Sequence, residues 1–187
     1  MKQMRWHKEE KRDSKDSDIM LHTADGEAWQ ALDLFDPEFA RDPRSVRLGL
    51  STDGFEPYST NSSPYSCWPV FIMPYNLPPN KCLKQGFIFL ALVIPGPKHP
   101  KKKINMFLRP LIEELKELWQ GIDAYDSHLK CRFNLHAAYL WSIHDYLAYG
   151  IFAGWCVHSR LSCPICMDDS DAFRLQHGRK VTFFDCH

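Results

Sequence analysis

The stretch SVRLGLSTDGF (45–55) is the most informative part of this chain, because an apolar strand pattern runs directly into a carboxylate. SVRLGL (45–50) is typical of a β-strand, and Asp53 and Gly54 follow after Ser51 and Thr52. Asp-Gly between hydrophobic residues favours a hairpin turn, since both residues tolerate positive φ. A carboxylate at the end of a buried strand is also where a metal-dependent enzyme would place a ligand. The segment alone leaves both interpretations of Asp53 open.

Further strand and helix patterns follow in a definite order. WPVFIMPY (68–75) and GFIFLALVIPG (86–96) predict strands, and the continuous apolar run of the second predicts burial on both faces. The 3.6-residue apolar stripe of INMFLRPLIEELKELWQGI (104–122) predicts a helix. RFNLHAAYLWSIHD (132–145) predicts another strand, and AYGIFAGWCVH (148–158) predicts a second helix.

This order predicts an α/β protein whose mixed sheet is flanked by helices. It is the order at the start of a ribonuclease-H-like fold, although unrelated α/β and α+β domains share it. We expect a polar N-terminal arm with a short helix broken by Pro37 (1–44), a partial ribonuclease-H-like core (45–160), and a Cys/His segment (161–187).

Composition narrows the class of protein. Lys+Arg and Asp+Glu are both 23, and this neutral balance does not exclude DNA binding, because local patches matter more than sums. The 7 cysteines are odd in number and no secretory signal precedes them, which argues for reduced thiols. The apolar run at 87–94 is shorter than the roughly 20 residues that span a bilayer. We therefore expect a soluble, intracellular protein with no membrane partner.

Asp145 repeats the pattern of Asp53, since a mostly apolar run ends in a carboxylate before a predicted helix. It could serve as the helix N-cap, a position that Asp fills well. It could also join Asp53 in a metal site, if the first and fourth strands are neighbours in one sheet. Two carboxylates there would hold Mg²⁺ or Mn²⁺, which prefer oxygen ligands. A pair of such ions about 3.5–4 Å apart can drive phosphoryl transfer.

The chain resembles the transposase of plant CACTA (En/Spm) DNA transposons. The matching stretches, in order, are MRWH (4–7), HTADGEAW (22–29), RLGLSTDGFEPY (47–58), YSCWPVFIMPYNLPP (65–79), LVIPGPKHPKKKI (92–104), LRPLIEELKELW (108–119), LWSIHDYLAYGIFAGW (140–155) and CPIC (163–166).

The resemblance implies a DDE/D-type nuclease with a ribonuclease-H-like core, which cuts at transposon ends and joins the freed 3′ hydroxyls to target DNA. Asp53 and Asp145 match its first and second acids. The third acid, a Glu in this family, is expected downstream of CPIC, and no residue up to His187 matches it. We therefore expect an incomplete core with little or no activity of its own. The resemblance also implies a nuclear location and transposon-end and target DNA as partners, and it leaves a homo-oligomer open.

Three departures from the family pattern surround these acids. His144 stands where the family usually has Asn, Leu147 replaces a Pro, and the first motif reads DGFEPY instead of DGFNPF. None of these three departures replaces either carboxylate, although His144 could compete with them for a metal ion.

Cys163 and Cys166 form C-x-x-C, half of a common zinc site. The resemblance favours His187 as a third ligand, and the fourth stays open between His177, Cys186 and a residue beyond the chain. The segment would then begin a zinc-binding insertion. The alternative is two ordinary reduced thiols in a loop.

Lys98, His99 and Lys101 to Lys103 form a dense basic patch that either contacts DNA phosphates or is a solvated loop. Trp119, Trp141 and His136 are expected in the core. Two functions remain in competition. The first is a transposase catalytic fragment. The alternative is a non-catalytic, transposon-derived DNA- or protein-binding module stabilised by zinc.

Overall fold

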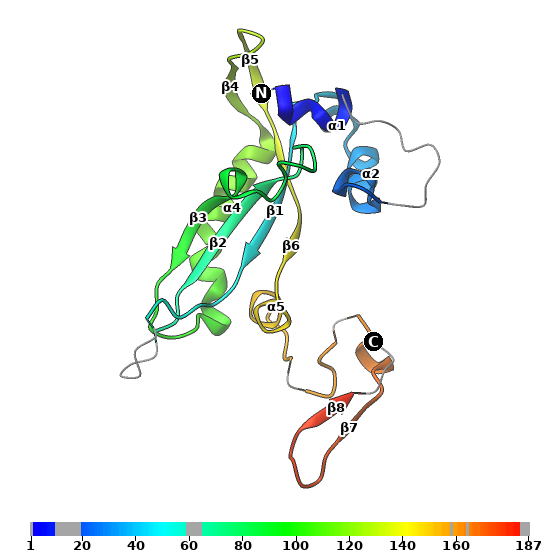
Figure 1. Cartoon of the computed structure of the whole chain (residues 1–187), viewed down its shortest axis with the longest axis vertical. Helices are drawn as coiled ribbons and strands as arrows, with labels where there is room; N and C mark the ends of the chain where they lie inside the picture. Colours follow the sequence, from blue (N-terminus) through cyan, green and yellow to red (C-terminus); the bar gives the residue numbers. More distant parts are fainter. Residues whose placement is uncertain (1, 10–19, 59–64, 158, 164, 184–187) are drawn as a thin grey trace. The chain divides into compact units, whose positions relative to one another are not determined.

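The structure is a computed structural model that describes residues 2–9, 20–58, 65–157, 159–163 and 165–183. The chain divides into two compact units, and Figure 1 labels the helices and strands that form them. Unit 1 comprises Met1–Ser51, Pro69–Val93 and Leu108–Ile143, and unit 2 comprises Thr52–Trp68, Ile94–Phe107 and His144–His187. Each unit is built from segments that are far apart in the sequence.

The described residues form five α-helices and eight strands. The helices are α1 (Trp6–Glu9), α2 (Glu27–Phe35), α3 (Pro37–Arg41), α4 (Ile104–Gln120) and α5 (Tyr146–Ala153). The strands are β1 (Val46–Thr52), β2 (Trp68–Pro74), β3 (Phe89–Ile94), β4 (Ile122–Asp126), β5 (Cys131–Leu135), β6 (Ala137–Ile143), β7 (Ala172–Arg174) and β8 (Val181–Phe183). The short helix predicted to break at Pro37 is confirmed, because α2 ends at Phe35 and α3 begins at Pro37.

Four strands form the main sheet in the order β3-β2-β1-β6. β1 and β6 run parallel as neighbours, which confirms that the first predicted strand and the strand predicted over 132–145 lie side by side in one sheet. β2 pairs with β1 on the other side, where the Tyr75 amide donates to the Arg47 carbonyl at 2.9 Å. An antiparallel bridge between Phe55 and Cys67 continues the β1–β2 pairing. The protein is therefore a mixed α/β structure, as the element order predicted.

An aromatic cluster forms the hydrophobic core of unit 1. Trp29 on α2 and Tyr75 after β2 are buried, together with Ala24 and Met73. Trp141 on β6 packs against this cluster, with its ring 5.0 Å from that of Tyr75. The expectation that Trp141 belongs to the core is thus confirmed.

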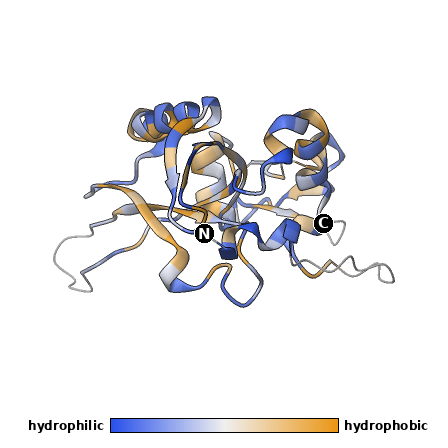
Figure 2. Ribbon diagram, turned by 90° about the horizontal axis from the view of Figure 1, so that it is seen from above, coloured by the Kyte–Doolittle hydropathy of each residue, from blue (hydrophilic) through white to orange (hydrophobic). Residues whose placement is uncertain are grey.

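The long helix α4 follows the predicted amphipathic pattern. Ile104, Leu108 and Leu111 are buried, while Arg109, Glu113 and Lys116 are exposed. Figure 2 shows hydrophilic and hydrophobic residues alternating along the helices. The helix also carries Pro110 in its interior. Trp119, near its C-terminal end, is 38% exposed and contacts Phe39, so the expectation that it lies in the core is wrong.

Two strand predictions are wrong in informative ways. The apolar segment at 86–96 forms β3 at the edge of the sheet, and Phe89, Leu90 and Val93 are 49–58% exposed rather than buried on both faces. The predicted strand at 132–145 is two strands, because β5 pairs with β4 in a hairpin while β6 pairs with β1. His136 lies between them, half-buried, and its ring bonds the Trp119 carbonyl and the Asn134 amide.

The second predicted helix is shorter than expected. α5 ends at Ala153, where Gly154 adopts a left-handed conformation with φ 69° and closes the helix. No helix in the described ranges is long and apolar enough to cross a membrane.

Candidate active site

A shift in strand register aligns the ends of β1 and β6, the strands that lead to Asp53 and Asp145. The β1–β6 pairing starts with Val46 opposite Ala137, shifts by one residue between Leu48 and Gly49, and ends with Ser51 opposite Ile143. Asp145 lies eight residues after Ala137, whereas Asp53 lies seven residues after Val46. The shift in register accommodates this one extra residue on β6.

The shifted register continues past the last paired residues. His144 donates from Nδ1 to the Thr52 carbonyl at 3.0 Å, so these two residues also lie level with each other. Asp53 and Asp145 come next on the two segments. Neighbouring strands lie about 4.8 Å apart, so the two acids emerge close together. Asp53 and Asp145 can share a site only if the two strands are neighbours. The structure meets this requirement.

Asp53 lies in an extended segment and not in a tight turn. Gly54 has no positive φ, and Phe55 returns to pair with Cys67, so the two-residue hairpin interpretation is wrong. Gly54 is needed for another reason. A Cβ atom there would lie 2.6 Å from the indole of buried Trp68. The glycine therefore lets the chain pass close to Trp68 and leaves the Asp53 side chain exposed.

Asp145 is the N-cap of α5, as the sequence suggested. Its Oδ1 accepts the Ala148 amide at 2.6 Å, and its backbone is extended with φ −69° and ψ 172°. The carboxylate therefore lies at the positive end of the helix dipole. Capping uses one carboxylate oxygen, so it does not compete with metal binding at the other.

Both acids line a hollow of about 640 Å³ in unit 2. Trp68, His99 and Lys101 line the same hollow. His99 is held by the Trp68 indole, whose Nε1 donates to its Nδ1 at 3.3 Å. The loop that carries it is fixed by the Ser66 amide, which donates to the Pro97 carbonyl at 3.0 Å. Part of the predicted basic patch is therefore positioned beside the two carboxylates.

The donor set of this hollow suits a hard divalent cation. Asp53 Oδ1 accepts the Gly54 amide at 2.6 Å, and Asp145 is bonded through Oδ1 in the same way. Within the described residues neither Oδ2 atom has a bonding partner. Mg²⁺ is commonly bound through one or two carboxylates, with waters and substrate phosphates completing its shell. The part of the chain that the structure describes holds no group of three His, Cys, Asp or Glu side chains that could bind a metal.

His144 does not line this hollow. Its Nδ1 donates to Thr52, its Nε2 is buried, and its ring packs 4.4 Å from Phe152. The substitution of His for Asn next to the second acid thus places a ring between the strand end and α5, away from the carboxylates.

Cys163 and Cys166 contact each other directly. The Cys166 amide points at the Cys163 sulfur, with N and Sγ 3.4 Å apart. The amides of Cys166 and Ile165 lower the pKa of the Cys163 thiol by stabilising its thiolate. His177 does not complete a three-ligand group with these cysteines among the described residues. His187 and Cys186, the other predicted ligands, lie outside the described residues.

The sheet and the hollow define a mixed α/β protein with two carboxylates at the ends of neighbouring parallel strands. The chain belongs to the transposase family tnp2, because the model of that family matches residues 17–187. A transposase family is thereby confirmed for the chain, as the resemblance implied. Searches of curated proteins and of solved structures found no match.

Sequence reasoning found both carboxylates but missed Trp68 as a lining residue. Little in the sequence indicates this role, because Trp68 begins an apolar strand. The hydrophobic pattern alone does not distinguish a residue that lines a site from one that only fills the core. His99 and Lys101 were noted for their charge alone, and the folding of their loop toward Ser66 and Trp68 could not be derived from spacing.

Proposed function

We propose that this chain is the catalytic domain, in whole or in part, of a metal-dependent DNA transposase. The observation that carries the proposal is that Asp53 and Asp145 line one hollow and follow the ends of neighbouring parallel strands. The proposal extends the family assignment, which concerns transposases in general, to a particular site and chemistry.

In this proposal the two acids bind Mg²⁺ or Mn²⁺ through the oxygens that their backbone partners leave available. The bound ions would activate a water or a 3′ hydroxyl and stabilise the leaving oxygen of a phosphodiester. Lys101 would attract the phosphate next to the scissile bond, since it lines the same hollow and is exposed. Trp68 and His99 would keep the loop in place through their mutual hydrogen bond.

The strand order supports a ribonuclease-H-like core. In β3-β2-β1-β6 the first three strands are consecutive in the sequence, and β6, which follows the long helix and the β4–β5 hairpin, lies parallel beside β1. We propose further that the protein is of the plant CACTA (En/Spm) type, acts in the nucleus, and takes transposon-end DNA and target DNA as substrates. These assignments depend on the sequence resemblance, and a third acid would have to be supplied from beyond the described hollow.

Strand cleavage and strand joining on transposon-end DNA, with Mg²⁺ or Mn²⁺, test the proposal. The experiment uses two forms of the protein, the present chain and a version extended downstream. In each form the wild type is compared with the variants Asp53→Asn and Asp145→Asn. Asn caps helices as well as Asp, so Asp145→Asn keeps the start of α5 while removing the charge. We expect the extended wild type to cut, and both variants to lose activity by at least a hundredfold, because removing single catalytic groups typically costs that much.

Asp168→Asn is the matched control, because Asp168 is exposed and does not line the hollow. It should leave cleavage unchanged. Robust cutting that survives both Asp53→Asn and Asp145→Asn would overturn the assignment of the site.

A non-catalytic binding module stabilised by zinc is the second candidate. This candidate is favoured by the contact in which the Cys166 amide points at the Cys163 sulfur. Cys163 and Cys166 would supply two of the four ligands of a structural zinc site. One zinc ion per chain, lost in Cys163→Ser, would support it if DNA binding occurred without cleavage in the extended chain. A folded chain with no zinc would exclude this candidate.

A further inference from the structure

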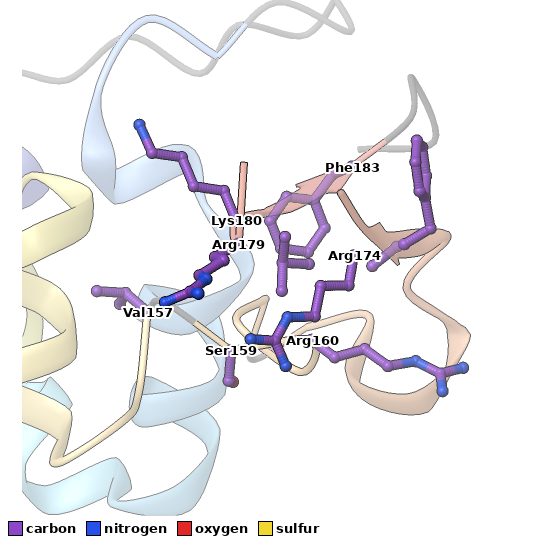
Figure 3. Close-up of a pocket in the computed structure, with 10 residues that line it drawn as sticks. Val157, Ser159, Arg160, Arg174, Arg179, Lys180 and Phe183 are labelled. Atoms are coloured by element: carbon purple, nitrogen blue, oxygen red, sulfur yellow. The ribbon is translucent and has the colours of Figure 1, made fainter. Parts of the chain in front are cut away.

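A second hollow, of about 940 Å³, lies in unit 2 and contains no catalytic candidate. It is formed by the β7–β8 hairpin and by the segment that follows α5. The hairpin is closed by two hydrogen bonds between Leu175 and the turn, from the Leu175 amide to the Lys180 carbonyl at 2.8 Å and from the Arg179 amide to the Leu175 carbonyl at 3.0 Å. Figure 3 shows its lining residues.

Four cationic side chains line this hollow, and no acidic side chain does. They are Arg160, Arg174, Arg179 and Lys180. All four are exposed, and within the described residues none of them takes part in an ion pair. In Figure 3 Arg174 and Arg179 extend toward the side of the hollow where Ser159 and Val157 lie. We refer to this hollow, with its four cationic side chains, as the basic hollow.

A bound anion would relieve the repulsion within such a cluster. Like charges around one concave surface repel each other, and low-dielectric walls strengthen the field that they produce. The chain as a whole is neutral, with 23 basic and 23 acidic residues, so the local excess does not follow from composition. Asp168, Asp169 and Asp171 precede β7 in sequence but do not line the hollow. Arginine forks match phosphate oxygens in a bidentate manner.

The size and shape of the basic hollow favour a polymer over a small anion. Its volume is many times that of one phosphate group, and three of its cations are spread along a hairpin. Phe173 also lines it and is 44% exposed, which offers an aromatic surface beside the cations. Grooves that combine cations with aromatic rings are typical of sites for single-stranded nucleic acid.

We propose that the basic hollow binds the phosphate backbone of a DNA strand, at a site separate in its residues from the Asp53–Asp145 hollow. Arg174 and Arg179 would contact phosphates, with Arg160 and Lys180 adding charge at the rim. The choice of DNA as the polyanion rests on the proposed function, whereas the prediction of a phosphate-binding site rests on the side chains alone.

The test is binding of fluorescein-labelled 20-nucleotide single strands and 20-base-pair duplexes, measured by anisotropy without divalent metal. Full chain is compared with Arg174→Gln/Arg179→Gln and with a control pair, Arg109→Gln/Lys84→Gln, in which both residues are exposed and outside the hollow. Losing two phosphate contacts should lower the slope of log affinity against log salt by about 1.8 for duplex and 1.4 for single strands. At 0.15 M salt the duplex affinity should fall roughly 30-fold.

The proposal requires the hollow variant to lose affinity while the control pair does not, with unchanged circular dichroism and melting temperature in both. Equal loss in both variants would mean general charge attraction and would overturn it. Stabilisation by inorganic phosphate without any DNA binding would also overturn it, because the site would then serve a small anion. Asp53→Asn and Asp145→Asn should bind like the wild type, so absence of cleavage would not affect this result.

Discussion

Arg47 carries a charge into the interior of unit 1, where it is fully buried. Its guanidinium pairs with Asp33 and donates to the Ser45 carbonyl at 3.1 Å. It also lies over two aromatic rings, 4.6 Å from Trp29 and 4.8 Å from Phe39. Burial lowers the pKa of this guanidinium and Asp33 raises it, so the partner offsets much of the cost of burying the charge.

Arg47→Met should destabilise the protein by about 3 kcal/mol, because it removes one partner of a buried pair and leaves the other unpaired. Arg132→Met is the matched control, since Arg132 pairs with Asp123 on the surface, where both side chains are more than half exposed. That control should cost less than about 1 kcal/mol. Urea unfolding measures both, and equal effects would contradict the structural role of Arg47.

His7 provides a pH-dependent contribution beside Arg47. Burial, followed by the charge of Arg47, lowers the His7 pKa from 6.5 to about 3. The unfolded chain therefore binds a proton below pH 6.5 that the folded chain does not bind until about pH 3. Within this window stability falls as pH falls, by up to about 1.4 kcal/mol per pH unit from this group.

His7→Gln should remove this contribution, because Gln does not titrate. The difference in unfolding free energy between wild type and variant should shrink steadily as pH is lowered from 6.5 toward 4. Urea unfolding at several pH values measures it. Parallel pH profiles for the two proteins would show that His7 is not held neutral by the fold.

At the scale of elements, a glycine in β1 makes room for an aromatic ring. A Cβ atom on Gly49 would lie 2.1 Å from Cε2 of Tyr75, whose ring is buried and packs against Trp141. Gly49 is also where the register of β1 against β6 shifts. The glycine therefore serves both the core and the alignment of the two strands.

Gly49→Ala should cost about 1–3 kcal/mol, since added volume in a packed core forces neighbours to move. Gly86→Ala is the control, because nothing lies within 4 Å of a Cβ atom at that position. Thermal unfolding should distinguish the two variants. If Gly49→Ala is as stable as Gly86→Ala, the close packing against Tyr75 is not a constraint.

Periodicity was sufficient to predict β1, β2, α4 and the start of α5, because each has one clear face or one continuous run. It failed at 132–145, where the chain changes partners near His136 without changing its hydrophobic pattern. It also failed for β3, because an apolar run does not reveal that this strand lies at the edge of the sheet formed by the described residues. Asp53 and Asp145 were predicted from strand ends and resemblance, whereas the basic hollow depends on a hairpin that composition does not reveal.

At the scale of the whole molecule, a site for divalent metal should make global stability depend on metal concentration. Mg²⁺ or Mn²⁺ at 100 times its dissociation constant would stabilise the folded state by about 2.7 kcal/mol. The melting temperature of the wild type should therefore rise with added metal, while that of an Asp53→Asn/Asp145→Asn double variant should not. An equal rise in both proteins would place the metal elsewhere.

The shifted pairing of β1 and β6 has a consequence for how this chain tolerates changes in length. Adding or deleting one residue between Gly49 and Asp53, or between Trp141 and Asp145, would turn one acid to the opposite side of the sheet. A change of the same size before Val46 would leave the two acids level. Gain or loss of single codons should therefore be tolerated upstream of the strand pair and selected against within these two short intervals.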